Sequence, residues 1–395
     1  MYVCLTQYSQ EMTTLDRILM QNIKTKLLPN KVVLIFGARR VGKTVLIRQV
    51  IKNFEGKVLI LNGEDDDSVA LLKEKSISNY RNLLKGIDLL VVDEAQNIPE
   101  IGQKLKLMVD EVDQIRIIAS GSSSFDLNNK AGEPLVGRSF TFLLFPFNQQ
   151  ELSANENLLE TRRKLESRLI FGTYPEVEMM DNDSDKTEYL KNLVNSYLLK
   201  DILAIEGIRN SGKMKDLLRL IAFQTGNEVS HDELAKQLSI SKNTVEKYLD
   251  LLSKVFIVYR LGAFSRNLRK EVTKAGKWYF FDNGIRNALI SNFNPIALRQ
   301  DIGALWESYL ISERIKNKYF NSSSVEHFFW RTYDGQEIDL IEENNTQISA
   351  IEFKYTERNM KVPRAFKDNY PEASFLQVHK ENYLPWLLNS PGNQS

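Results

Sequence analysis

The chain has 395 residues, of which 43% are hydrophobic, and its 52 lysines and arginines nearly balance 51 aspartates and glutamates. This length suffices for two or three packed domains, and the near-zero net charge excludes a uniformly basic nucleic-acid-binding coat. The only cysteine, Cys4, excludes an internal disulfide framework, and three histidines speak against a Cys/His zinc site.

Polar and charged residues interrupt the first 20 positions, so the start lacks the continuous apolar core of a signal peptide. Elsewhere the sequence contains no apolar stretch long enough to span a bilayer. We therefore expect a cytoplasmic protein without a membrane segment.

After a helical lead-in at residues 1–30, short β-branched runs alternate with amphipathic segments from residue 31 to 148, as is typical of βαβ units around a parallel sheet. The predicted strands are Val32–Phe36, Lys57–Leu61, Asp88–Val92, Arg116–Ala119 and Phe140–Leu144. The predicted helices include Lys43–Phe54 and Gly102–Asp110. This region is expected to be one α/β domain.

The segment GARRVGKT follows the first of these strands and precedes a helix, which is the context that a phosphate-binding loop requires. Its glycines let successive N–H groups point at phosphate oxygens, and the helix N-terminus adds a positive field. We expect Lys43 to reach the β- and γ-phosphates and Thr44 to bind Mg²⁺. The predicted nucleotide-binding residues are Gly37, Ala38, Arg39, Arg40, Val41, Gly42, Lys43 and Thr44. The alternative is a glycine-bearing turn with a chance Lys-Thr pair.

The segment LLVVDEAQ is an apolar strand that ends in two carboxylates, at the sheet edge where ligands of parallel sheets gather. We expect Asp93 to bind Mg²⁺ through water and Glu94 to activate the attacking water. Alone, such a pair is often a strand end that meets solvent, but next to a phosphate-binding loop the functional interpretation is favoured.

Two further residues are candidates for the same reaction. Ser120, at the end of the strand after Asp93, could orient water against the γ-phosphate; Ser122 is the rival, and a loop of small turn residues is the plain alternative. Arg138 could act as an arginine finger in a neighbouring subunit, although arginines at strand starts are usually just solvated.

These motifs, together with ASGSSS and GRSFTFLLFPFNQQEL, resemble a family of predicted prokaryotic AAA+ ATPases in which a P-loop domain is fused to a C-terminal domain of unknown function. The resemblance runs from about Lys31 to Tyr355. It implies an AAA+ core with an added central strand, and it implies no settled biological role.

Residues 149–200 are largely polar and are predicted to form connecting helices that serve as a lid or linker. Within residues 201–288, the stretch Val229–Leu261 has helix-turn-helix patterning and resembles a winged helix, with Val255–Tyr259 and Trp278–Phe281 as the wing strands. The candidate DNA-contacting residues on its second helix are Lys242, Asn243, Thr244 and Lys247. Winged helices also serve as protein-binding modules and lids, so DNA contact stays one of two alternatives.

In the last predicted domain, residues 289–388, a period of two places Asp339 on one face of GQEIDLI and both Glu352 and Lys354 on one face of AIEFKY. With Glu307 on the amphipathic helix Ala304–Lys318, this constellation resembles the PD-(D/E)XK nuclease fold, in which Asp339 and Glu352 would bind Mg²⁺. The alternative is an unrelated α+β domain with a solvated Glu/Lys face. Residues 389–395 are expected to form a disordered tail.

The predicted fold is thus an α/β P-loop NTPase with an AAA+-type parallel sheet, followed by a winged helix and a small α+β restriction-nuclease-like domain. The predicted cofactors are ATP and Mg²⁺, and the expected activity is ATP hydrolysis coupled to domain movement on double-stranded DNA, with a second copy of the chain or an unknown protein as a further partner. The alternatives are a regulatory module that binds ATP with little turnover and a metal-dependent nuclease licensed by ATP.

Overall fold

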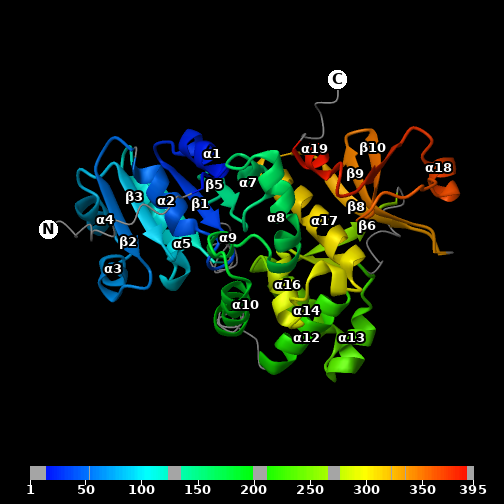
Figure 1. Cartoon of the computed structure of the whole chain (residues 1–395). Coiled ribbons are helices and arrows are strands. Elements are labelled where there is room, and N and C mark those ends of the chain that lie inside the picture. Colours follow the sequence, from blue (N-terminus) through cyan, green and yellow to red (C-terminus); the bar gives the residue numbers. More distant parts are fainter. Residues whose placement is uncertain are drawn as a thin grey trace.

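The computed structural model describes residues 15–52, 54–122, 135–198, 211–265, 276–321, 323–333 and 335–388. Two β-sheets lie at opposite ends of the molecule, with a block of helices between them (Figure 1). The predicted tail at residues 389–395 lies outside the described residues, as do residues 1–14 of the predicted lead-in. Among the described residues, no helix combines the length and the apolarity needed to cross a membrane.

The first sheet has five parallel strands in the order β2-β3-β4-β1-β5. Their bounds are β1 Lys31–Phe36, β2 Val58–Asn62, β3 Leu89–Asp93, β4 Arg116–Gly121 and β5 Ser139–Leu143. All five predicted strands are confirmed within two residues. Because β4 lies between β1 and β3, the sheet has the added central strand that the family resemblance implies.

The helices of this region are α1 Leu19–Lys26, α2 Lys43–Lys52, α3 Asp66–Leu71, α4 Ile77–Leu83, η1 Ala95–Asn97 and α5 Ile101–Glu111. The chain crosses from β1 to β2 in one direction and from β3 to β4 in the other, so right-handed crossovers place α2 and α5 on opposite faces of the sheet. With both faces covered, the central strands are buried along nearly their whole length, which explains their continuous Val, Ile and Leu runs.

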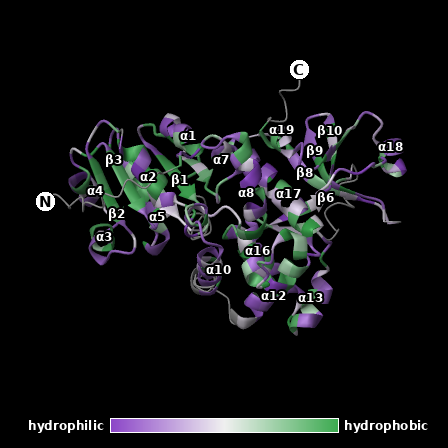
Figure 2. Cartoon of the chain, viewed as in Figure 1, coloured by the Kyte–Doolittle hydropathy of each residue, from purple (hydrophilic) through white to green (hydrophobic). Residues whose placement is uncertain are grey.

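The polar stretch after β5 forms helices, as predicted. These are α7 Gln149–Ser153, α8 Leu158–Phe171, α9 Pro175–Glu178 and α10 Asp183–Asn192, followed by a π-helical segment η2 Leu193–Leu198. In Figure 2 the strands of the first sheet are mostly green, whereas much of α10 is purple. Several of the polar residues are nevertheless deeply buried: Asn148 and Gln149 have at most 1% of their surface exposed.

A helix-turn-helix follows, made of α12 Ser211–Phe223, α13 His231–Leu238 and α14 Lys242–Lys254. The apolar residues predicted to share a face on α13 and α14 are buried. An antiparallel hairpin of β6 Val258–Ala263 and β7 Lys277–Phe280 comes next, then α16 Asn283–Leu289 and η3 Ile296–Leu298. The predicted strand start at Val255 is wrong, because the helix continues to Lys254 and Phe256 turns the chain with φ 60°.

The C-terminal part consists of α17 Ile302–Phe320, β8 Glu326–Arg331, β9 Glu337–Asn344, β10 Gln347–Phe353, α18 Arg364–Asn369, β11 Ser374–Val378 and α19 Tyr383–Leu388. Its strands join the hairpin in one sheet, in the order β11-β10-β9-β8-β6-β7. This sheet therefore crosses the domain boundary predicted at residues 288–289 through the pairing of β6 with β8.

Helix α17 differs from the predicted amphipathic helix. It is buried on nearly every side, including its charged residues Glu313, Arg314 and Lys316. It lies between the two sheets (Figure 1) and touches strands of both, β5 on one side and β7 and β10 on the other.

Candidate active site

The predicted phosphate-binding loop connects the buried end of β1 to the start of α2. A Cβ on Gly37 would lie 2.1 Å from the carbonyl oxygen of Leu144, so only glycine allows β5 to end so close to the loop. Gly42 has φ 97° and Arg40 has φ 65°, which curl the chain back toward the helix. The side chains of Ala38 and Val41 are buried, so these residues can reach a ligand only through their backbone.

Lys43 lies over the loop that precedes it. Its side chain is 4% exposed, and its Nζ donates hydrogen bonds to the carbonyl oxygens of Gly37 at 2.9 Å and Ala38 at 3.1 Å. The ammonium group is thus held inside the loop by the carbonyls of the loop itself.

Asp93 connects three parts of the site. Its Oδ2 accepts a hydrogen bond from the Thr44 hydroxyl at 2.7 Å, and its Oδ1 accepts one from the Ser120 hydroxyl. The backbone N–H of Glu94 donates to Ser120 Oγ at 3.3 Å. The carboxyl ends of β3 and β4 and the start of α2 therefore converge on one carboxylate.

Glu94 has a left-handed backbone conformation, with φ 49° and ψ 42°, directly after β3. Its carboxylate accepts a hydrogen bond from the side-chain amide of Gln96 at 2.6 Å. Gln96 was not predicted as a site residue, although it is the last residue of the LLVVDEAQ motif. Its place in that motif, two residues after Glu94, could have indicated the contact, because the backbone turns at Glu94 and brings the Gln96 amide to the Glu94 carboxylate.

The two remaining candidates lie apart from this cluster. Ser122 is buried, but no hydrogen bond connects it to Asp93, Glu94 or Thr44 within the described residues. Arg138 precedes β5 at the amino edge of the sheet, opposite the phosphate-binding loop, and its Nε lies 2.6 Å from Asp110 Oδ1. It does not enter its own chain's site, so its role as a finger in a neighbouring subunit stays a prediction.

The donors at this site suit the predicted magnesium ion. Mg²⁺ prefers oxygen ligands and usually takes one or two from the protein, with water and phosphate completing the octahedron. The Thr44 hydroxyl and the Asp93 carboxylate are such ligands, and they are adjacent.

The candidate DNA-contacting residues lie at the start of α14, after a turn in which Ser239 has φ 54°. Lys242, Asn243 and Lys247 are exposed, whereas Thr244 is half-buried and lies 2.8 Å from the Ser241 hydroxyl. The Lys242 ammonium is 2.9 Å from Asp232. The exposed face is therefore polar but carries acidic residues as well as lysines.

The four nuclease-like candidates come together at the C-terminal sheet. Asp339 Oδ2 accepts a hydrogen bond from the backbone N–H of Phe353 at 2.8 Å, which places it beside Glu352 on the paired strand. Lys354 Nζ donates to Glu352 at 2.7 Å. Glu307 reaches the same cluster from α17 and interacts electrostatically with Asp339.

Burial is the largest influence on the pKa values of these acids, and it raises them. Burial and then the neighbouring Asp339 charge raise the pKa of Glu307 to about 7. Burial also raises the pKa values of Asp339 and Glu352, and the charge of Asp339 raises that of Glu352 further. Within the part of the chain that the structure describes, no three His, Cys, Asp or Glu residues are arranged to hold a metal ion.

Two further residues of this cluster, Lys277 and Tyr279 on β7, were not predicted from the sequence. The Lys277 ammonium is 3.4 Å from Glu307 and also pairs with Glu337, and the Tyr279 hydroxyl donates to Glu307 at 2.5 Å. The period of two in KWYF places both residues on one face, but nothing local indicates that this face meets acids 28 to 60 residues away.

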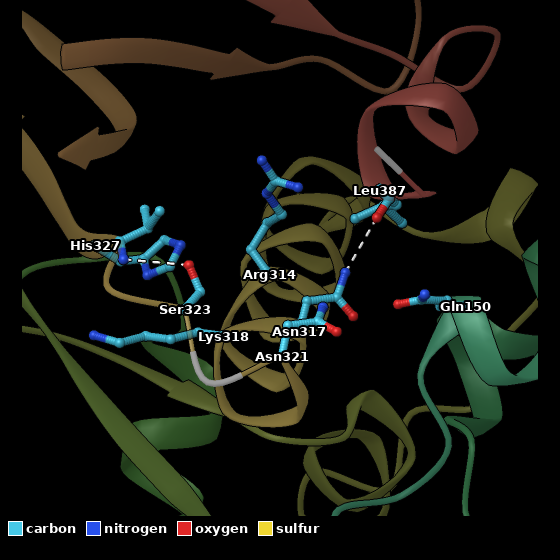
Figure 3. Close-up of a pocket in the computed structure, with 9 residues that line it drawn as sticks. Gln150, Arg314, Asn317, Lys318, Asn321, Ser323, His327 and Leu387 are labelled. Carbon is cyan, nitrogen blue, oxygen red and sulfur yellow. Dashed lines mark hydrogen bonds between the residues drawn. The ribbon is translucent and has the colours of Figure 1, made fainter. Parts of the chain in front are cut away.

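A separate small hollow lies beside the C-terminal end of α17 (Figure 3). Arg314 from α17 binds Glu342 through two nitrogens, at 2.7 and 2.8 Å, and His327 from β8 lies 3.3 Å from the same carboxylate. The hollow has room for about 30 Å³, which suits an ordered water rather than a nucleotide. This hollow is therefore too small for a nucleotide.

Comparison with known families divides the chain into three segments. Residues 29–153 match the model of an AAA domain, residues 162–295 match the domain of unknown function DUF8612, and residues 302–386 match the domain of unknown function DUF4143. The first match covers the whole cluster around Asp93.

Related chains extend over most of the protein. The uncharacterized protein MJ1544 of Methanocaldococcus jannaschii is 24% identical over 363 residues, which cover 87% of this chain and 79% of the relative. The uncharacterized protein Rv2008c of Mycobacterium tuberculosis is 26% identical over 330 residues, covering 82% and 70%. The Walker-type ATPase PABY2304 of Pyrococcus abyssi aligns with 73% of this chain and 99% of its own, with a TM-score of 0.49 and 16% identity. The parallel sheet, the loop and the family match together make residues 29–153 a P-loop domain of the AAA type.

Proposed function

We propose that this chain is a Mg²⁺-dependent ATPase whose hydrolysis drives rearrangement of the helix-turn-helix and C-terminal domains on double-stranded DNA. The observation that carries the catalytic part is the contact of the Thr44 hydroxyl with Asp93, beside the Lys43 ammonium. These three groups are the ones that magnesium and a triphosphate need. Lys43 and Thr44 begin α2 and Asp93 ends β3, and the two elements meet at one sheet edge.

Each residue has a defined task in this proposal. Lys43 exchanges its bonds to the loop carbonyls for bonds to the β- and γ-phosphates, and the loop N–H groups hold the remaining oxygens. Thr44 and Asp93 would hold the metal ion, which when bound would neutralise phosphate charge. Glu94 accepts the proton of the attacking water, and the Ser120 hydroxyl keeps the Asp93 carboxylate in place.

The connection to the rest of the molecule supports coupling. Leu144 N–H donates to Phe36 O at 2.7 Å, immediately before the phosphate-binding loop. A few residues later, the backbone N–H of Gln149 donates to Glu313 on α17, and the Tyr309 hydroxyl donates to Gln149 Oε1 at 2.8 Å. In this proposal, these bonds pass a shift of the loop to the helix that lies between the sheets.

A second link runs through Arg17. Its guanidinium is buried, lies 3.0 Å from Glu151 Oε1 and donates to the carbonyl of Val41 in the loop at 3.4 Å. The loop and helix α7 are thus bridged by a residue that precedes the sheet in sequence.

The test is an ATPase assay on the purified chain with and without duplex DNA. We expect Lys43→Ala to weaken ATP binding at least about tenfold, because it removes charge-assisted hydrogen bonds of roughly 1.5–3 kcal/mol. Glu94→Gln should keep ATP bound while abolishing single-turnover hydrolysis. Unchanged ATP affinity in Lys43→Ala would contradict the assignment of this loop as the ATP-binding site. Unchanged single-turnover hydrolysis in Glu94→Gln would instead favour a regulatory module that binds ATP with little turnover.

Duplex DNA should raise the ATPase rate of the unmodified chain. The double variant Lys242→Ala, Lys247→Ala removes two exposed charges from the start of α14 and should reduce this stimulation and its salt dependence. Lys106→Ala, on α5 of the ATPase domain, is the matched control. If the double variant responds to DNA as the unmodified chain does, α14 is not the DNA-contacting element.

A further inference from the structure

The acidic cluster of the C-terminal sheet contains a cation that belongs to the chain. The Lys277 side chain is 1% exposed, and its ammonium pairs with Glu307 at 3.4 Å and with Glu337. The ring of Phe329 lies 5.3 Å from the same nitrogen, which closes another side of the group. A fully buried lysine is rare unless it is paired, and here one of its partners, Glu307, belongs to the constellation that resembles the nuclease fold.

One carboxylate oxygen of Glu307, of Asp339 and of Glu352 already accepts hydrogen bonds from the chain. Glu307 Oε1 accepts hydrogen bonds from both the Lys277 ammonium and the Tyr279 hydroxyl. One Asp339 oxygen accepts the N–H of Phe353, and one Glu352 oxygen accepts the Lys354 ammonium. A metal ion bound at any of these three oxygens would have to displace a donor of the chain.

The positive charge of Lys277 also opposes metal binding. A divalent cation bound to Glu307 would lie within a few ångströms of the Lys277 ammonium, with little water between them to screen the repulsion. Among the described residues, no group of three His, Cys, Asp or Glu side chains has an arrangement that could hold a metal ion. The residues present therefore do not fit the metal ion that the nuclease resemblance implies.

We infer that Lys277 takes the place of a metal ion in the Glu307, Glu337 and Asp339 cluster, so that the C-terminal domain does not act as a metal-dependent nuclease. The same ammonium ties together three elements, because Lys277 is on β7, Glu307 is on α17 and Glu337 is on β9. The β6–β7 hairpin and the C-terminal sheet, which lie side by side in Figure 1 and share one strand order, are then locked into a single body.

Titration with Mn²⁺, followed by electron paramagnetic resonance, tests this inference on the full-length chain without nucleotide. An Asp93→Asn background removes the carboxylate of the ATPase site, so the result does not depend on the proposed ATPase activity. With Lys277 intact, no Mn²⁺ should bind with an affinity in the micromolar range. Lys277→Met, similar in length and without charge, should gain one Mn²⁺ site, and adding Asp339→Asn should remove it again.

Three outcomes would overturn the inference. The first is a Mn²⁺ ion that binds with Lys277 intact and is lost in Asp339→Asn. The second is a folded Lys277→Met chain that gains no site, and the third is Mg²⁺- or Mn²⁺-dependent cleavage of plasmid DNA that Asp339→Ala abolishes. The first and third measurements need only chains that retain Lys277, so they decide the matter even if Lys277→Met does not fold, which circular dichroism would reveal.

Discussion

Asp93 is the residue on which the candidate active site depends, because both of its oxygens are bound by hydroxyls from other elements. The carboxylate cannot rotate without breaking a bond to Thr44 or Ser120. Its orientation is therefore set before any ligand binds, which reduces the ordering required when a nucleotide arrives.

This arrangement distinguishes two serines that the sequence left as rivals. Ser120→Ala removes a hydrogen bond to a carboxylate, which is worth roughly 1.5–3 kcal/mol, so we expect kcat to fall about tenfold or more. Ser122→Ala, two residues away and also buried, is the matched control and should leave kcat within about twofold. Steady-state ATPase kinetics measure both, and equal losses in the two variants would contradict the assignment of Ser120.

At the scale of secondary-structure elements, Gly284 allows helices α8 and α16 to pack closely. A Cβ on Gly284 would lie 2.0 Å from the carbonyl oxygen of Phe171, the last residue of α8. Nearby, the Asp282 carboxylate caps α16 and also accepts the N–H of Thr173 at 2.7 Å. The two helices meet backbone against backbone.

We expect Gly284→Ala to lower the free energy of unfolding by about 1–3 kcal/mol, because backbone atoms cannot move aside as a side chain can. Gly303→Ala, in α17, has no atom within 4 Å of the added Cβ and should be neutral or slightly stabilising. Urea denaturation measures both. A Gly284→Ala chain as stable as the Gly303→Ala chain would refute this account of the junction.

The ion pair between α17 and β9 predicts a pH dependence. Burial opposes ionisation of Glu342, but the hydrogen bond from His327 and the charge of Arg314 lower its pKa to about 2. Because the pKa is lower in the folded chain than in the unfolded one, the stabilisation is complete above about pH 4.5 and is lost as the pH falls toward 2.

Glu342→Gln should therefore destabilise the chain at pH 7 by about 3–5 kcal/mol, since it removes the negative charge that faces the buried Arg314 guanidinium. The difference from the unmodified chain should shrink between pH 4.5 and pH 2. Urea denaturation over that pH range is the measurement, with the half-buried neighbour Glu343→Gln as control. A constant difference across the range would show that the pair does not titrate in this way.

At the scale of the whole molecule, α17 is the helix that contacts both sheets. It touches β5 of the first sheet and strands β7 and β10 of the second, and it carries Glu307 toward the second sheet and Tyr309 toward α7. Most of its polar side chains are buried in bonds to other segments, so its position depends on both ends of the protein.

Tyr309→Phe removes the single hydroxyl that joins α17 to Gln149. If hydrolysis is coupled through this contact, duplex DNA should stimulate the variant at least about twofold less, corresponding to a coupling energy of 0.5–2 kcal/mol, while the basal ATPase rate stays within about twofold. Tyr319→Phe, on the same helix but 46% exposed, is the matched control. If duplex DNA stimulates the ATPase rates of Tyr309→Phe and Tyr319→Phe equally, hydrolysis is not coupled through this contact.

The sequence alone predicted the parallel sheet, the phosphate-binding loop and the acidic end of β3, because each is a run of consecutive residues whose pattern reflects local geometry. It also predicted the helix-turn-helix faces and the strand faces that carry Asp339 and Glu352. It did not predict that Asn148, Gln149 and Glu313 are buried, because a polar run resembles a surface segment until its hydrogen-bond partners, more than 160 residues away, are known.

Only the tertiary structure decided which charges meet. Lys277 has no local feature that separates it from an exposed strand lysine, and its partners Glu307 and Glu337 lie 30 and 60 residues further along the chain. The pairing of β6 with β8 and the burial of α17 bring them together. Whether an acidic cluster faces solvent, a metal ion or an ammonium of its own chain depends on those long-range contacts, which no local pattern of residues encodes.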